Sequence, residues 1–287
     1  MIALATNTDF LSSTNSPEKI LRLISEAGFT HLHWCHQWCT DFQYSRSEIA
    51  QIKQWLKTYG LKLLDIHGST GKEKWWCAAE EYRRQAGVEL AVNRMVMFSE
   101  LEGEGALMMH VPCAKIHTPA ECDAMMRTFE DLLPHMQKYG CRVACENMNG
   151  YDEDYVMIDR LLAAFPEKWV GLTYDSGHGN FPVNMIDYID ARKNRLMALH
   201  LNDNDGTQDQ HQPAFYGTVD WNKIARIIQE SPYTNPLSFE VSMHCTPFFD
   251  RKLADKGEPQ MDADVLEALK DHYQRALKVR SLIPKYN

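Results

Sequence analysis

Short apolar runs alternate with longer amphipathic segments along the whole chain, and this alternation constrains the fold more than any other feature. The apolar runs are too short for helices and lack a 3.6-residue period, so each one predicts a β-strand. Parallel strands need crossovers of the length that the amphipathic segments provide. The predicted strands are 2–6, 30–35, 61–67, 106–110, 142–146, 169–175, 196–201 and 236–241.

Capping residues mark the ends of several intervening helices. Ser16 and Pro17 suit the N-cap and the first position of one helix, and Gly28 ends it. Thr118 and Glu121 have the spacing of a capping box. Helical patterns also cover 49–59, 75–102, 155–165, 183–194, 220–230 and 261–282.

Eight strand–helix units in a chain of 287 residues predict an α/β protein with one domain, a single (β/α)8 TIM barrel that spans residues 1–287. Barrels of about 250 residues routinely fold as one domain. A doubly wound open sheet is the structural alternative, and it usually has a glycine-rich turn after its first strand. The corresponding segment here, ATNTDFLSS, contains no glycine, which favours the barrel.

Composition and charge exclude several classes of protein. The 44% hydrophobic and 24% charged residues are typical of a globular protein with a large core. A net charge of −9 disfavours binding to nucleic acid. No apolar run approaches the roughly 20 residues that span a bilayer, so no membrane partner is expected. Cys35 and Cys39 lack the second pair of a zinc knuckle, and we expect reduced thiols in a cytoplasmic protein.

Metal-binding residue types end six consecutive predicted strands, from the third to the eighth. Carboxylates and imidazoles are scarce in buried strands, so a run of six is difficult to assign to chance. In a barrel the C-terminal ends of the strands surround the active site. The six residues are His67, His110, Glu146, Asp175, His200 and Glu240.

Carboxylates that converge at a barrel mouth repel one another unless protons or a cation neutralise them. A divalent metal does this, and mixed carboxylate and imidazole ligands suit Zn²⁺, Mn²⁺ or Co²⁺. His178 follows Asp175 in YDSGH, and Asp209 and His211 follow His200 in a crowded polar stretch. These three residues are candidates to hold a further ion.

Four short motifs in this set resemble those of the xylose isomerase-like TIM-barrel superfamily, which includes ketose 3-epimerases, inosose dehydratases and abasic-site nucleases of the endonuclease IV type. The motifs are ENMNG at 146–150, YDSGH at 174–178, HLND with the later DQH at 200–211, and FEV at 239–241.

The resemblance implies a role for each matching residue. In the epimerases one metal is held by the residues that match Glu146, Asp175, His200 and Glu240, and the two glutamates form the acid–base pair. In the nuclease a three-zinc cluster is completed by residues that match His67, His110, His178, Asp209 and His211. All of these residue types are present here.

We therefore expect an isomerase or epimerase that depends on a divalent metal and acts on a small carbohydrate, either a sugar, a sugar phosphate or a polyol. Glu146 and Glu240 would transfer the proton, with His178 orienting a substrate oxygen if it is not a ligand. Trp76 is expected to cover the barrel mouth, and Lys115 to meet a phosphate group. A lyase or dehydratase uses the same chemistry and stays open.

Two other functions remain as alternatives. The first is a zinc-dependent phosphodiesterase of the endonuclease IV type, which ranks second because the loops predicted to surround the mouth are acidic. The nuclease also usually has a basic residue where this chain has Gln210. The second is a barrel that binds sugar without catalysis. The resemblance also implies that the protein forms a homo-oligomer.

Overall fold

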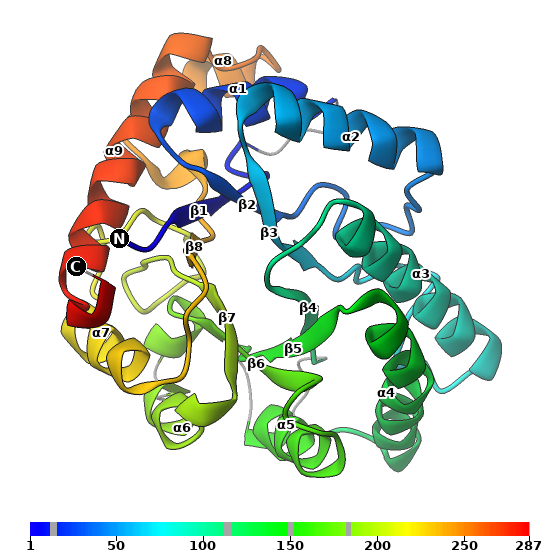
Figure 1. The fold of residues 1–287 in the computed structure, drawn as a ribbon. Helices are drawn as coiled ribbons and strands as arrows, with labels where there is room; N and C mark the ends of the chain where they lie inside the picture. The colour runs from blue at the N-terminus through cyan, green and yellow to red at the C-terminus, as the bar shows by residue number, and fades with distance from the viewer. Residues whose placement is uncertain (12–15, 112–115, 149–151, 182–184, 287) are drawn as a thin grey trace.

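Eight parallel strands form the centre of the computed structural model, which describes residues 1–11, 16–111, 116–148, 152–181 and 185–286. The order around the sheet is β7-β6-β5-β4-β3-β2-β1-β8. Figure 1 shows the strands enclosed by helices. The strands are β1 (Leu4–Asn7), β2 (His31–Trp34), β3 (Lys62–His67), β4 (Ala106–His110), β5 (Arg142–Glu146), β6 (Val170–Asp175), β7 (Leu196–His200) and β8 (Leu237–Phe239).

The barrel closes between β7 and β8, where the ladder is reduced to a bridge between Leu201 and Phe239. Leu201 donates its N–H to the carbonyl of Ser238 at 3.0 Å, and Glu240 donates its N–H to Leu201 at 3.1 Å. The predicted (β/α)8 barrel and its eight strands are therefore confirmed.

The helices lie outside the strands, and a hydrophobic cluster fills the space between the two layers. Strands with few polar residues need this cover on their outer face. The helices are α1 (Glu18–Ala27), α2 (Arg46–Tyr59), α3 (Glu81–Glu100), α4 (Pro119–Tyr139), α5 (Asp152–Ala164), α6 (Met185–Ala191), α7 (Trp221–Glu230), α8 (Arg251–Asp255) and α9 (Asp262–Ser281).

Local signals in the sequence correctly place most helix ends. Thr118 and Glu121 form the predicted capping box at the start of α4. Gly28 ends α1 with a φ of 113°, a left-handed conformation that glycine adopts without steric cost. The first helix begins one residue later than predicted, with Pro17 as its N-cap.

The predicted helix 75–102 begins only at Glu81. Trp76 instead lies in an irregular segment that packs directly on α3. The two backbones are so close at Gly87 that a Cβ added there would lie 2.4 Å from the backbone nitrogen of Trp76. The Thr128 hydroxyl of α4 donates to the carbonyl of Trp76 at 2.6 Å. Tertiary contacts thus replace the first helical turns that local sequence favours.

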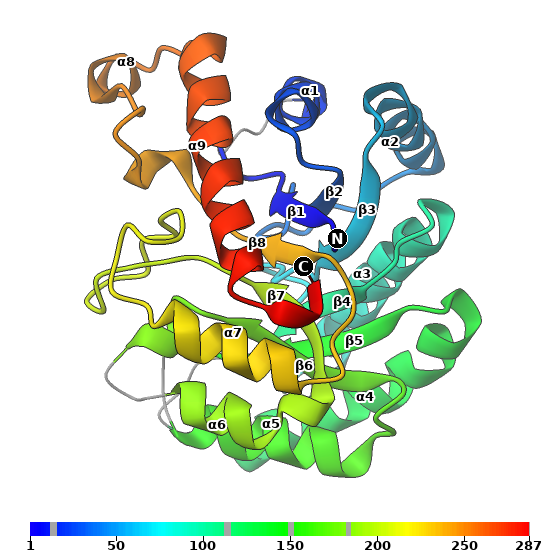
Figure 2. The same ribbon diagram turned by 60° about the vertical axis from the view of Figure 1, so that its left-hand side comes forward.

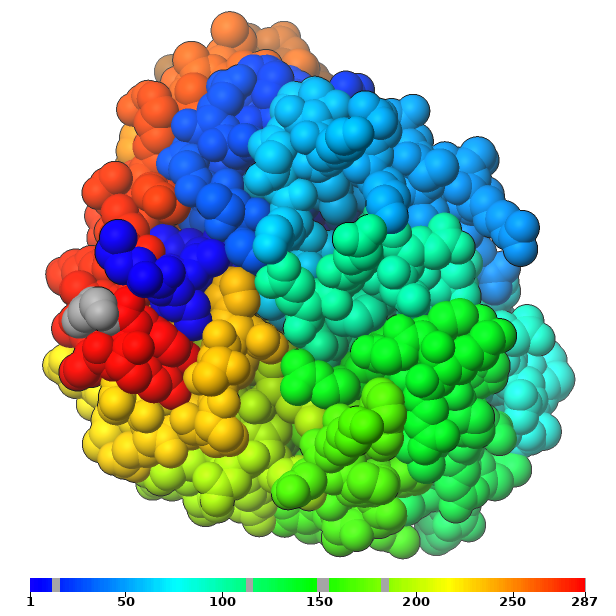
Figure 3. All heavy atoms as spheres, in the orientation of Figure 1, coloured from blue at the N-terminus to red at the C-terminus, as the bar shows by residue number. Residues whose placement is uncertain are grey.

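The two ends of the chain meet on one side of the barrel. Arg280 of α9 donates to the carbonyl of Ile2 at 3.0 Å, and Figure 3 shows the first and last segments adjoining each other. Figure 2 shows α8 beyond the opposite end of α9. Within the described residues, the helices are all too short or too polar to cross a membrane.

Candidate metal centre and active site

The six metal-binding residue types predicted at strand ends lie together at the C-terminal end of the barrel. Five are the last residues of β3 to β7, and Glu240 directly follows β8. Parallel strands bring these ends to the same edge, so residues far apart in sequence become neighbours. Three of them, Glu146, Asp175 and His200, have no exposed surface.

The central group consists of Glu146, Asp175, His200 and Glu240, and one ligand atom from each lies within 4.8 Å of the others. His200 Nδ1 lies 3.0 Å from Glu240 Oε2 and 3.3 Å from Glu146 Oε2. The two glutamates therefore approach the same ring nitrogen from different strands, with their carboxylates close to each other.

Several polar atoms of this group lack hydrogen bonds although they are buried. They include both carboxylate oxygens of Glu146 and both ring nitrogens of His200. Such atoms are costly unless they are satisfied, and three acids with one imidazole are a donor set for a divalent cation. The residues of this group therefore fit the metal that the sequence predicts.

Charge interactions dominate the protonation of the two glutamates. Burial alone raises the pKa of Glu146, but the His200 and His110 imidazoles outweigh it and hold the pKa well below its usual value. His200 and His211 outweigh burial in the same way at Glu240, whose pKa is also low. Both side chains are therefore carboxylates near neutral pH, the form that binds a metal or accepts a proton.

Asp175 is held by a polar network that the sequence did not reveal. Its Oδ2 accepts a hydrogen bond of 2.8 Å from the side-chain amide of Asn202, and its Oδ1 accepts one of 2.7 Å from the backbone N–H of His178. Asn147 bonds both the N–H and the carbonyl of Asp175. Burial raises the pKa of Asp175 to about 6. The only sequence signal for the two asparagines is their place just after strand ends, in ENMNG and HLND.

A second group joins His67 and His110 to the same Glu146, again with ligand atoms within 4.8 Å. His110 Nε2 lies 3.1 Å from Glu146 Oε2. His67 Nδ1 contacts the Gly68 carbonyl at 2.8 Å, which leaves Nε2 for a ligand. Trp38 packs against both imidazoles, tilted against His67 with ring centroids 4.4 Å apart and edge-on to His110 with ring centroids 5.6 Å apart. This indole is half-buried and lies directly beside these ligands.

The third group consists of His178, Asp209 and His211. Asp209 Oδ2 lies 3.2 Å from His178 Nε2 and 3.1 Å from His211 Nε2. The Nδ1 atoms contact the carbonyls of Asn147 and Glu240 at 2.9 and 3.0 Å. Backbone carbonyls of this kind orient metal-binding imidazoles, so both Nε2 atoms face the carboxylate where an ion would bind.

Asp209 and His211 face the same point because the residue between them turns away. The Gln210 amide accepts from the Asp205 N–H at 2.9 Å and donates to the Asp205 carboxylate at 3.1 Å. His211 has a φ of 47°, which is uncommon for a residue other than glycine. Unusual backbone conformations of this kind concentrate at functional sites.

The expected substrate contacts of Trp76 and Lys115 have different outcomes. Trp76 does not cover the barrel mouth: it is 2% exposed and packs against Phe129, with ring centroids 5.9 Å apart. A side chain between two helices in the core has no face for a sugar, so the expected role is corrected. Lys115 lies outside the described residues.

Three buried polar residues near the centre were not predicted as site residues. His33 Nδ1 lies 2.5 Å from Asp65 Oδ1, and both side chains are almost fully buried. Cys35 Sγ lies 3.7 Å from Glu240 Oε1. His33 and Asp65 lie within strands whose apolar neighbours suggest core packing, and Cys35 directly follows β2. The sequence around these three residues does not distinguish them from residues of the core.

Comparisons with known proteins agree with the fold. The chain matches the family described as xylose isomerase-like TIM barrel over residues 21–272. It is 27% identical to the uncharacterized protein y4fM of Sinorhizobium fredii over 250 residues, which are 78% of this chain and 80% of that protein.

Solved structures with the same fold include sugar epimerases. A D-psicose 3-epimerase in the presence of D-fructose has a TM-score of 0.73 and 13% identity, with 97% of this chain and 99% of that chain covered. The 3-keto-D-glucoside 4-epimerase YcjR from E. coli has a TM-score of 0.70 and 16% identity, with 97% and 100% covered. At these identities the likeness concerns the fold.

Proposed function

The chain belongs to the xylose isomerase-like TIM barrel family, and on this premise we propose that it is a divalent-metal-dependent isomerase or epimerase of a small carbohydrate. The observation that supports this most directly is the central group, in which two glutamate carboxylates approach the same ring nitrogen of the buried His200. Sugar epimerases among the proteins of the same fold are consistent with this reaction class.

The cation would be held by Glu146, Asp175, His200 and Glu240. When bound, a divalent cation polarises a carbonyl and the adjacent hydroxyl and lowers the pKa of the C–H bond between them. The ligand types suit Zn²⁺, Mn²⁺ or Co²⁺.

Glu146 and Glu240 form the proposed acid–base pair. Because both pKa values lie well below the usual value, each side chain starts as a carboxylate that can accept a proton. One glutamate removes the proton from carbon. In an epimerisation the other glutamate first takes up a proton from solvent and then gives it to the opposite face of the same carbon. The substrate carbon would lie between the two carboxylates.

His178 is proposed to orient the substrate or to hold a further ion. Its Nδ1 lies 3.4 Å from Glu146 Oε1, and its Nε2 contacts Asp209. Trp38 replaces Trp76 as the proposed aromatic contact, because its indole lies against His67 and His110 at the end of the barrel.

Proton exchange at carbon tests this proposal directly. The purified protein is loaded with Zn²⁺, Mn²⁺ or Co²⁺ and incubated in D2O with free and phosphorylated ketopentoses and ketohexoses. We expect deuterium beside the carbonyl and a Glu240→Gln rate lower by about 100-fold or more. Glu267→Gln, on the exposed face of α9, is the matched control. Full exchange in Glu240→Gln, or none with any sugar, would contradict the proposal.

A zinc-dependent phosphodiesterase of the endonuclease IV type remains the second candidate. The observation that favours it is the presence of more than one ligand group, because clustered ions suit phosphate ester hydrolysis. The net charge of −9 opposes the approach of a DNA backbone. Specific incision of an abasic-site duplex by the zinc-loaded protein at physiological salt would place this function first.

A further inference from the structure

His33 and Cys35 bring two more ligand types to the inside of the barrel. They are two residues apart at the end of β2, so both side chains face the interior. With Glu240 they form a fourth group of possible ligand atoms within 4.8 Å of one another, and all three residues are buried.

The His33 imidazole is oriented as a metal ligand would be. Its Nδ1 contacts the Asp65 carboxylate at 2.5 Å, while its Nε2 is buried and has no hydrogen-bond partner. Metal-binding histidines usually donate their other ring N–H to a carboxylate or carbonyl, which fixes the tautomer. Asp65 thus leaves the buried Nε2 of His33 free to bind an ion.

Cys35 is held in place by its backbone. The Thr8 hydroxyl accepts hydrogen bonds from the N–H groups of Cys35 at 2.9 Å and His36 at 3.1 Å. Tyr44 donates its hydroxyl to the His36 carbonyl at 2.6 Å and accepts from the Trp34 indole at 2.9 Å.

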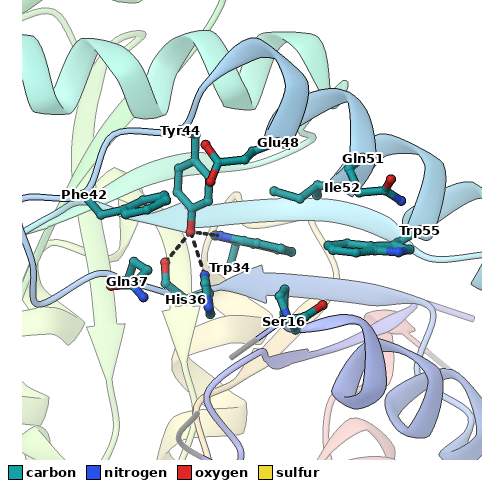
Figure 4. Close-up of a pocket in the computed structure, with 11 residues that line it drawn as sticks. Ser16, Trp34, His36, Gln37, Phe42, Tyr44, Glu48, Gln51, Ile52 and Trp55 are labelled. Carbon is teal, nitrogen blue, oxygen red and sulfur yellow. Dashed lines mark hydrogen bonds between the residues drawn. The ribbon is translucent and has the colours of Figure 1, made fainter. Parts of the chain in front are cut away.

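Figure 4 shows the hydrogen bonds of the Tyr44 hydroxyl beside a cavity of about 290 Å³ that lies between the end of β2, α2 and the residues just before α1. Trp34 points into this cavity, so the residues on either side of it point into the barrel. The hydrogen bonds of Tyr44 therefore fix the segment that positions the Cys35 thiol.

Glu240 connects this group to the central one through its two oxygens. Its Oε2 lies 3.0 Å from His200 Nδ1, whereas its Oε1 lies 3.7 Å from Cys35 Sγ. A carboxylate with its oxygens directed to two sets of ligands is arranged to bridge two cations.

We propose that His33, Cys35 and Glu240 form an additional metal site, adjacent to the central group and sharing Glu240 with it. A thiolate with an imidazole and a carboxylate selects Zn²⁺ or Co²⁺ over Mg²⁺, Ca²⁺ and Mn²⁺, which prefer oxygen ligands. The thiol of Cys35 releases its proton to solvent when it coordinates the ion. The sequence disfavours a zinc knuckle from Cys35 and Cys39, and it does not show that ligands from the ends of β2 and β8 converge.

Cobalt spectroscopy tests this site independently of catalysis. The metal-free protein is titrated with Co²⁺ until every site is filled, and the near-ultraviolet absorption is recorded. Coordination by Cys35 produces a thiolate-to-cobalt charge-transfer band in the wild type. We expect Cys35→Ser to lose this band and about one equivalent of bound metal, while Cys39→Ser, a matched change in the same segment, keeps both.

His33→Gln provides a second variant that retains the thiol. It should weaken Co²⁺ binding at this site and alter the band, whereas the metal held by the other groups stays bound. A fully loaded wild type without a thiolate band would overturn the proposal. So would a band that persists in Cys35→Ser.

The result separates this site from the proposed reaction. A protein that binds Co²⁺ without a thiolate band and still exchanges protons on a sugar retains the proposed function and lacks the additional site. A protein that shows the band but exchanges no sugar proton has the site without that function.

Discussion

Glu146 connects more of the candidate ligands than any other single side chain discussed above. Its Oε2 lies near both His110 and His200, and its Oε1 lies near His178. It belongs both to the central group and to the group with His67. A change at this residue should therefore affect two ions at once, whereas changes at Asp175 or His211 should affect one.

Glu146→Gln tests this connection. Removing the charge takes away one anionic ligand from each group, so we expect the bound metal to fall by about two equivalents and turnover by about 100-fold or more. Elemental analysis after gel filtration gives the metal content. Glu267→Gln should retain the wild-type content. A loss confined to one equivalent would show that only one of the two groups holds an ion.

Asn202 is a positioning residue for the central group. Its amide donates to Asp175 Oδ2 at 2.8 Å, and removal of such supporting contacts typically lowers metal affinity by about 10- to 100-fold. We expect Asn202→Ala to show this loss in competition with a chelator. Asn222→Ala, on the exposed side of α7, is the control. Wild-type affinity in Asn202→Ala would limit Asn202 to a packing role.

Among the structural elements, the loop after β7 decides the geometry of the third ligand group. Asp203 organises this loop: its carboxylate accepts hydrogen bonds from the Asn204, Phe215 and Val219 N–H groups and from the Trp221 indole. The crowded polar stretch thus has two roles. Asp203 stabilises the loop, and Asp209 with His211 presents ligand atoms.

Asp203→Ala should therefore loosen the third group while sparing the central one. Four donors lose their acceptor, so we expect increased hydrogen exchange across residues 203–219 and loss of about one equivalent of metal. Hydrogen exchange with mass spectrometry and metal analysis measure both effects. Loss of the central ion as well would show that the two groups are not independent.

The strands and most helices were predictable because they depend on local patterns. Alternating apolar and amphipathic segments predicted every strand, and the capping box at Thr118 predicted the start of α4. The predicted start of α3 was wrong. The residues predicted to form its first turns are not helical, because Trp76 contacts Gly87 and Thr128 instead. Such contacts join residues of different elements and leave no local signal.

The candidate site was predictable to the extent that it follows from the ends of the strands. The six candidate ligands at the strand ends, of which His67 is the first and Glu240 the last, could be predicted because parallel strands end at the same edge of the barrel. The pairing of His33 with Asp65 and the approach of Cys35 to Glu240 depend on which side chains face each other across the barrel. The expected role of Trp76 was wrong because the sequence does not show which way an aromatic side chain points.

At the scale of the whole molecule, we expect metal affinity to depend on pH, because protons compete with the metal for the same side chains. In the metal-free protein, burial lowers the pKa of His211, but Asp209 outweighs it and raises the pKa to about 10. Interaction with Asp175 and Asp209 likewise outweighs burial and raises the pKa of His178 well above its usual value. These imidazoles must lose their protons before they bind an ion.

The sign of the pH effect differs between the two forms of the protein. A pKa of His211 that is raised on folding stabilises the metal-free protein fully below the unfolded value of about 6.5. This stabilisation is lost as pH rises toward the folded value of about 10. Over the same range, metal binds more tightly because fewer protons compete with it, and a ligand that binds only the folded state stabilises that state.

We therefore expect the difference in Tm between zinc-loaded and EDTA-treated protein to grow from pH 6 to pH 8. Differential scanning calorimetry at fixed free zinc measures it. His211→Gln removes one of the competing imidazoles, so its difference in Tm should be smaller and should depend less on pH. Cys39→Ser should behave as the wild type does. A difference that stays constant or shrinks with pH would show that the third ligand group is held by protons and not by a metal.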